Sequence, residues 1–84
     1  DIVAKEGDIL CFVEVRTLMD PDYGHPFESI TESKKRKLSM AAVEYMMIHN
    51  LEDINARFDV IAIDEISGDK VNLEMIRNAF ETRV

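Results

Sequence analysis

The alternation of apolar and polar residues predicts a β-hairpin at the beginning of the chain. Residues 1–4 and 9–17 are rich in β-branched residues, as strands usually are. Between them, residues 5–8 form a polar segment with a glycine, the residue that best accepts a positive φ in a turn. We expect an antiparallel pair, with Ala4 opposite Ile9 as one register and a shift by one residue as the alternative if a bulge forms at Gly7.

One helix is predicted over residues 32–50, where apolar residues recur at intervals of three and four. The residues of this stripe are Leu38, Ala41, Ala42, Tyr45 and Ile48. Thr31 precedes the helix and is a suitable N-cap, because its hydroxyl can accept a hydrogen bond from a free amide of the first turn. The stripe is expected to face the core.

The remaining segments complete a small α/β domain. Residues 18–30 hold two prolines and a glycine, so we interpret them as a long surface loop. Residues 58–63 are almost continuously apolar, as in a strand covered on both faces. A polar turn at 67–70 leads into residues 71–76, which are predicted to be an edge strand. With no internal repeat or linker, residues 1–84 are expected to form a single domain.

Composition supports a folded globular domain with one core. The chain has 84 residues, of which 46% are hydrophobic and 32% are charged. Cys11 is the only cysteine, which excludes an internal disulfide and a zinc site built from several cysteines, so it is expected to be a small core residue. Four methionines are also expected to fill the core, namely Met40, Met46, Met47 and Met75.

No segment of the sequence predicts insertion into a membrane or secretion. A run of about 18 apolar residues is absent, and the N-terminus lacks the basic and then apolar pattern of a signal peptide. We therefore expect a cytoplasmic location and no membrane partner. The chain starts directly in an apolar run, so we expect that it begins inside a longer protein. A homodimer is compatible with the sequence, which does not give the oligomeric state.

Charge is the strongest argument against nucleic-acid binding, since the formal net charge is −7 and affinity for polyanions comes from lysine and arginine. The charge is unevenly placed, however, because residues 34–37 are all basic. Cations in the first turns of a helix oppose its macrodipole at about 0.3 to 1 kcal/mol each, so folding alone does not favour them. We predict that phosphates contact Lys34, Lys35, Lys37 and Arg57. The alternative is a solvated face balanced by Glu28 and Glu32.

One acidic residue of the second strand stands among apolar neighbours. Strand alternation places Glu14 on the same face as Phe12 and Arg16. In the expected register Asp1 lies opposite Phe12 and diagonal to Glu14, at a separation of roughly 7 to 8 Å. The two carboxylates could then share one cation. The alternative is an ordinary ion pair between Glu14 and Arg16 on a half-exposed sheet.

These strands resemble the paired strands of the PD-(D/E)xK nucleases and, more specifically, the YraN family. The resemblance begins with Asp1-Ile2-Val3-Ala4 and Phe12-Val13-Glu14-Val15-Arg16-Thr17. Further stretches agree in the same order, namely Tyr23-Gly24 with Pro26, Thr31 with Lys34 and Leu38, Arg57-Phe58-Asp59-Val60-Ile61-Ala62, and Asn78-Ala79-Phe80. The match covers nearly the whole chain, and the ordered set of short motifs is fairly specific.

The resemblance implies a restriction-endonuclease-like α/β core, a mixed β-sheet with a flanking helix. The family's first helix and first strand are absent from this chain. It further implies an endonuclease-like protein that hydrolyses phosphodiester bonds, with DNA the expected nucleic acid. The implied Mg²⁺ or Mn²⁺ ligands are Asp1, Glu14 and the main-chain carbonyl of Val15. Arg16 replaces the usual lysine, so it can orient water or steady a phosphate but cannot act as a general base.

Two other classes of function are compatible with the same residues. One is a nucleic-acid-binding module that has kept the fold and lost cleavage. The other is a protein-interaction domain, which the net charge of −7 fits best. A direct ion pair between Glu14 and Arg16 would favour these alternatives, and a cation held between Asp1 and Glu14 would favour the enzyme. Asp59 is interpreted as a hydrogen-bonding residue at the core edge, with a catalytic role as the less favoured alternative.

Overall fold

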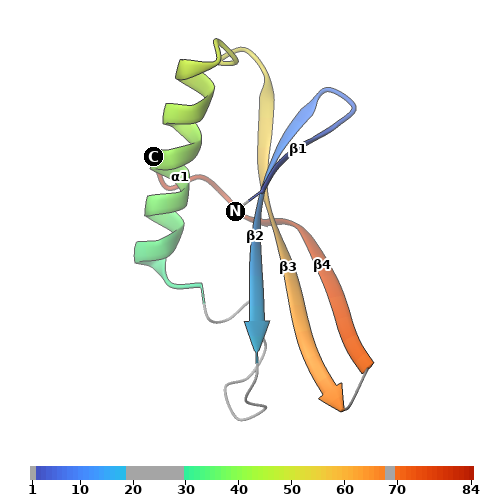
Figure 1. The fold of residues 1–84 in the computed structure, drawn as a ribbon. Coiled ribbons are helices and arrows are strands. Elements are labelled where there is room, and N and C mark those ends of the chain that lie inside the picture. Colours follow the sequence, from blue (N-terminus) through green and yellow to red (C-terminus); the bar gives the residue numbers. More distant parts are fainter. Residues whose placement is uncertain (1, 19–29, 68–69) are drawn as a thin grey trace.

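The computed structural model describes residues 2–18, 30–67 and 70–84, which form a four-stranded sheet with one helix packed against it (Figure 1). The elements in chain order are β1 (Ile2–Glu6), β2 (Ile9–Leu18), α1 (Glu32–Ile48), β3 (Asn55–Ser67) and β4 (Lys70–Phe80). The strand order is β1-β2-β3-β4. Because β2 and β3 are parallel while both outer pairs are antiparallel, the sheet is mixed. The predicted α/β class with a mixed sheet and a flanking helix is confirmed.

The N-terminal hairpin forms as predicted, but its register is different. Ala4 pairs with Cys11, and Ile9 pairs with Glu6, so the turn has two residues instead of four. Gly7 has a φ of +58°, a conformation that suits the tight hairpin turns whose twist matches the strands. The expected pairing of Ala4 with Ile9 was therefore wrong. The predicted place of Asp1 lies outside the described residues.

Helix α1 connects the two parallel strands and packs its sheet-facing side on β2 and β3. Thr31 caps it as predicted, since its hydroxyl accepts a hydrogen bond of 3.1 Å from the amide of Lys34. The core cluster contains Ala42, Phe58 and Phe80. The rings of Phe58 and Phe80 stack with their centroids 4.7 Å apart.

The buried stripe of α1 is narrower than the sequence predicts. Ala42 is buried, and Leu38 and Tyr45 are half-buried. Ala41 and Ile48 are exposed, so their assignment to the core-facing side was wrong. A single helix that crosses a twisted sheet contacts it along only part of its surface, and the remaining apolar positions face away.

Several predicted core methionines are also on the surface. Met40, Met47 and Met75 are exposed, whereas Met46 is half-buried. Cys11, in contrast, is buried and unpaired, as expected for a small core residue.

Strands β3 and β4 extend beyond their predicted limits. In β3, Val60 and Ala62 face the helix side and are buried, while Ile61 and Ile63 are only half-buried. Among the described residues the helix covers one face of this strand, and on the other face Asp59 is fully buried. Strand β4 lies at the edge of the sheet, as predicted. Within the described part of the chain no helix is long and apolar enough to cross a membrane.

A bulge in β4 is held by a buried carboxylate of β3. The pairing shifts between Phe58, which lies opposite Phe80, and Val60, which lies opposite Ile76. In the extra stretch Asn78 has a φ of +52°, which asparagine adopts more readily than most residues. Its amide donates a hydrogen bond of 2.9 Å to Oδ1 of the fully buried Asp59. This confirms the interpretation of Asp59 as a hydrogen-bonding residue.

Candidate functional site

Glu14 lies in the middle of the sheet face that α1 covers. The residue is 5% exposed, and within the described chain its Oε2 atom is buried without a hydrogen-bond partner. Its Oε1 atom lies 3.7 Å from Nη1 of Arg16 and 3.7 Å from Nζ of Lys34. These are ion pairs beyond hydrogen-bond distance. The contact with Lys34 places Glu14 beside the N-terminal half of α1.

An unpartnered carboxylate oxygen at this depth is unfavourable for folding. Burying a polar group without a hydrogen bond costs about 1–3 kcal/mol, and more when the group is charged. The carboxylate also borders a cavity of about 190 Å³. Most of the other lining residues are apolar or aromatic and include Phe12, Leu38, Tyr45 and Phe58. Low-dielectric walls strengthen the attraction between a carboxylate and a cation.

The donor chemistry of Glu14 fits a hard divalent cation, but this residue alone cannot hold one. Carboxylate and carbonyl oxygens are the ligands that Mg²⁺ and Mn²⁺ prefer. Among residues 2–18, 30–67 and 70–84 no group of three histidine, cysteine or acidic side chains could bind a metal. The neighbouring strand β1 begins at Ile2, which pairs with Val13. Asp1, the other predicted acidic ligand, lies outside the described residues.

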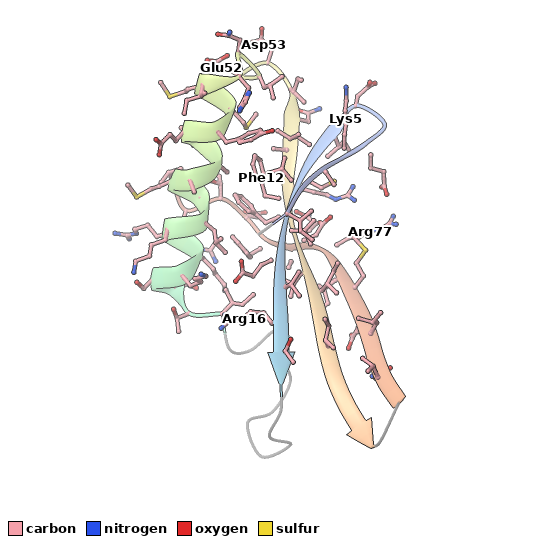
Figure 2. The ribbon with its side chains drawn as sticks, in the orientation of Figure 1. Lys5, Phe12, Arg16, Glu52, Asp53 and Arg77 are labelled. Atoms are coloured by element: carbon pink, nitrogen blue, oxygen red, sulfur yellow. The ribbon has the colours of Figure 1, made fainter. Side chains whose placement is uncertain are left out.

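Arg16 lies two residues beyond Glu14, on the same face of β2. Figure 2 shows its side chain near the end of the sheet where α1 begins. Its side chain is 31% exposed, and it is paired with Glu14 through Nη1. The structure thus brings together three of the residues predicted for the site, namely Glu14, Arg16 and Lys34.

The basic run of the helix does not form one cluster. Consecutive helical residues point about 100° apart, so neighbouring lysines face different surroundings. Lys34 faces Glu14. Lys35 is 17% exposed, pairs with Glu32 at 3.3 Å and lies over the ring of Phe80 at 5.8 Å. Lys37 is exposed and lines a groove on the outer side of the helix. Only Lys34 among these three contacts the Glu14 site.

Arg57 is separated from the Glu14 site by the sheet. Arg57 pairs in register with Cys11 of β2. Cys11 and Glu14 are three residues apart on this strand, so their side chains lie on opposite faces of the sheet. Its Nε atom donates to both carboxylate oxygens of Asp59 at 3.0 Å, and its Nη2 atom pairs with Glu6 at 3.2 Å. The Asp59 hydrogen bond raises the pKa of the Arg57 guanidinium above its ordinary value. The structure thus places Arg57 and Lys34 on different faces of the sheet, and phosphate binding by Arg57 stays a prediction.

Cys11 lies beside this ion-pair cluster. Burial raises the pKa of its thiol, with the carboxylates of Asp59 and Glu6 adding to the effect and the Arg57 guanidinium opposing it. A protonated buried thiol is a poor nucleophile and a poor metal ligand. This supports a structural role for Cys11.

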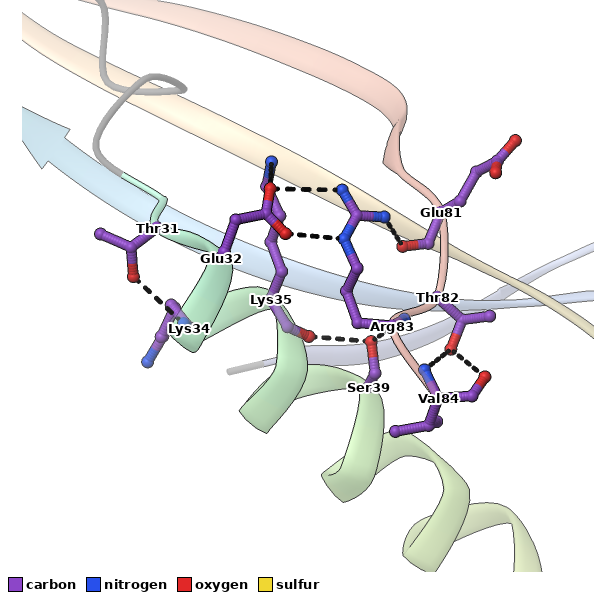
Figure 3. A network of polar contacts seen from close by, with 9 residues as sticks. All are labelled: Thr31, Glu32, Lys34, Lys35, Ser39, Glu81, Thr82, Arg83 and Val84. Atoms are coloured by element: carbon purple, nitrogen blue, oxygen red, sulfur yellow. Dashed lines mark hydrogen bonds and ion pairs between the residues drawn. The ribbon is translucent and has the colours of Figure 1, made fainter.

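A polar network at the start of α1 was missed by the sequence reasoning (Figure 3). Nε of Arg83 donates to Glu32 at 2.9 Å, and the backbone amide of Arg83 donates to the hydroxyl of Ser39 at 2.9 Å. Ser39 is fully buried and donates in turn to the carbonyl of Lys35 at 2.8 Å. The hydrogen bonds from Arg83 and then from Lys35 lower the pKa of the Glu32 carboxyl to about 2, from an ordinary value of 4.5.

This network ties the C-terminal residues 81–84 to the helix and places a further cation, Arg83, beside its first turn. The signal that could have indicated this network is Ser39. It is a polar residue three positions before the buried Ala42, so helical spacing places it on the buried side of α1. A short segment such as 81–84 has no periodicity from which its docking could be predicted.

Comparisons with known proteins identify relatives but no solved structure. The family model described as "Uncharacterised protein family UPF0102" matches residues 1–63. The UPF0102 protein of Geobacter sulfurreducens is 47% identical over 81 residues, which cover 96% of this chain and 63% of that protein. The UPF0102 protein of Chlorobaculum tepidum is 45% identical over 87 residues, covering 95% and 66%. That of Rhodococcus opacus is 41% identical over 80 residues, covering 95% and 68%.

The chain thus spans roughly two thirds of the length of these curated relatives. No solved structure matches it significantly.

Proposed function

Since the chain belongs to the uncharacterised family UPF0102, which is the YraN family, we propose that it is part of a metal-dependent nuclease-like protein. The proposed reaction is hydrolysis of phosphodiester bonds in nucleic acid, with DNA as the expected substrate. The observation that carries the proposal is the buried carboxylate of Glu14, whose Oε2 atom has no hydrogen-bond partner within the described chain. A group that is costly to bury and adjoins a cavity is characteristic of functional sites.

The proposed cation ligands are Glu14, Asp1 and the main-chain carbonyl of Val15. Asp1 directly precedes Ile2, whose partner across the hairpin, Val13, directly precedes Glu14. Two neighbouring carboxylates provide the negative charge and hard oxygen atoms that Mg²⁺ or Mn²⁺ requires. When bound, the ion supplies Lewis-acid stabilisation of the phosphate and activation of water.

Arg16 and Lys34 are the proposed phosphate-binding side chains. Both cations lie 3.7 Å from Oε1 of Glu14, so a phosphate held beside this carboxylate is within their reach. Hydrolysis forms a bond between water oxygen and phosphorus, breaks the bond to the leaving oxygen and transfers a proton to that oxygen. Arg16 stays protonated throughout, so it orients water and balances charge but does not accept the proton.

Metal binding by the intact protein tests this proposal. Calorimetric titration with Mn²⁺ is expected to give an affinity that falls about tenfold or more in Glu14→Gln, which keeps the shape of the side chain and removes its charge. The matched control is Glu52→Gln, because Glu52 is an exposed acid in the connection between α1 and β3. Nicking of supercoiled plasmid in Mn²⁺ should be lost in Glu14→Gln and kept in the control. Equal Mn²⁺ affinity of all three proteins would contradict the proposal.

A second candidate function is a nucleic-acid-binding or protein-interaction module without catalysis. The observation in its favour is the ion pair of Glu14 with Arg16, accompanied by the ion pair with Lys34. Both cations already neutralise the carboxylate on which a metal would depend. Failure of the parent protein to bind Mn²⁺, together with retained binding of nucleic acid or protein, would support this second function.

A further inference from the structure

The side of α1 that faces away from the sheet carries several exposed apolar side chains that are neighbours on the helix surface. Met40, Val43, Met47 and Ile48 are between 43% and 66% exposed. Together with Ala41 and Val84 they line a groove of about 670 Å³. Sulfur-containing side chains can be seen projecting from the helix on this side (Figure 2). Contiguous exposed apolar surface of this kind marks an interaction site.

The same groove is lined by one cation and one anion, Lys37 and Glu44. They are seven residues apart, which places them on one side of the helix with a rise of about 10.5 Å between them. This separation is too long for an ion pair within the helix. In the described part of the chain neither side chain forms an ion pair with another residue. The groove therefore carries one charge of each sign, with Met40, Ala41 and Val43 between them.

We propose that this groove binds the same groove of a second copy of the chain, with the two α1 helices antiparallel around a twofold axis. Lys37 and Glu44 are equally distant from the midpoint between Met40 and Ala41. An axis at that midpoint places Lys37 against Glu44 of the partner subunit and, by symmetry, Glu44 against Lys37 of the partner subunit. Both charges are then paired, and Met40 and Ala41 of the two helices cover one another at the axis.

The residues at the crossing point favour close packing of the helices. Ala41 has the small side chain that lets two helix axes approach to within the usual 8–10 Å. Met40 is flexible and adapts to an opposing apolar surface. The net charge of −7 opposes association in general, so specific pairing needs complementary charges of the kind that this groove carries. The dimer does not depend on metal binding by Glu14.

Charge reversal in the intact protein tests the register of this dimer. Sedimentation equilibrium of the parent protein is expected to show a reversible dimer. Lys37→Glu and Glu44→Lys should each weaken it by about tenfold, because each creates two like-charge contacts. The double variant Lys37→Glu/Glu44→Lys should restore it. Lys5→Glu is the matched control, since it makes the same charge change on the exposed strand β1.

Mixing the two single variants provides the sharpest result. Each should be largely monomeric alone, and together they should form a heterodimer in which both ion pairs are re-formed with opposite polarity. Met40→Glu should abolish association without unfolding, because this side chain lies at the proposed axis and is 58% exposed in the monomer. A monomeric parent protein, as expected if another part of the longer protein covers the groove, would overturn the proposal. A dimer that persists unchanged in Met40→Glu and in both charge reversals would also overturn it.

Discussion

Replacing Glu14 by leucine is expected to make the protein more stable. Exchanging a buried ion for an apolar residue of similar size is often neutral or stabilising by about 1–4 kcal/mol, because the desolvation cost disappears. Glu14 has one unpartnered oxygen, and its two ion pairs are long, at 3.7 Å each. The partners Arg16 and Lys34 are 31% and 41% exposed, so they remain hydrated after the exchange. We therefore expect a gain of about 1–2 kcal/mol in the free energy of unfolding.

The other buried acid, Asp59, provides the contrast. Its oxygens accept hydrogen bonds from Arg57 and from the amide of Asn78. Asp59→Asn keeps an acceptor for Asn78 but removes the charge that faces a mostly buried guanidinium. Breaking a buried pair by removing one partner usually costs about 3–5 kcal/mol. Because Arg57 retains Glu6 as a partner, we expect a loss near the lower limit, about 3 kcal/mol.

Urea denaturation followed by circular dichroism gives both free energies of unfolding by linear extrapolation. The chain has no tryptophan, so the helical signal is the better probe. The expected result is opposite signs for Glu14→Leu and Asp59→Asn. A loss of more than about 1 kcal/mol in Glu14→Leu would show that the Glu14 carboxylate supports the fold. The stability argument for a functional Glu14 would then be wrong.

Three further results are expected. Arg83→Ala should lower the melting temperature above pH 4.5, because the hydrogen bond from Arg83 stabilises the ionised form of Glu32 and lowers its pKa to about 2. The difference in melting temperature between the variant and the parent protein should vanish as the pH falls towards 2. Asn78→Ala should cost about 1 kcal/mol in urea denaturation, whereas Asn78→Gly should not, since φ is +52°. In fluorescence anisotropy with duplex DNA, Lys34→Ala should make the slope of log K against log salt shallower by about 0.9, and Lys35→Ala should change it less.

The local elements could be predicted because their signals are local. Thr31 and the apolar spacing after it are sufficient to indicate α1, and β-branched residues around a glycine indicate the hairpin. Glu14 could be singled out because an acid alternating with Phe12 on a strand is chemically anomalous. Its approach to Lys34 could be expected from the family resemblance but not from spacing, since β2 and α1 meet only through tertiary packing.

The features that were missed depend on contacts between distant parts of the chain. Register depends on whether the turn at Gly7 uses two residues or four, and both choices preserve the alternation of faces. The bulge at Asn78 forms because Asp59, nineteen residues earlier, accepts its amide hydrogen. The docking of Arg83 on Glu32 joins residues 51 positions apart in the chain. Sequence periodicity contains no information on such pairings.

Metal binding and nucleic-acid binding should be coupled, because Lys34 and Arg16 pair with Glu14 and are also the proposed phosphate-binding side chains. Without metal both cations neutralise Glu14, so their charge is partly unavailable to phosphate. A divalent ion that takes over this neutralisation makes Lys34 more available to phosphate, and linkage requires that the two ligands then strengthen each other's binding. We expect Mn²⁺ to raise the affinity of the parent protein for duplex DNA by about fivefold or more, measured by anisotropy with a cleavage-resistant phosphorothioate duplex. In Glu14→Gln Lys34 no longer faces an ionised carboxylate at this position, so affinity without metal should be higher than in the parent protein and insensitive to Mn²⁺. If the parent protein and Glu14→Gln respond equally to Mn²⁺, the ion acts on the nucleic acid or elsewhere on the protein, and Glu14 does not couple the two ligands.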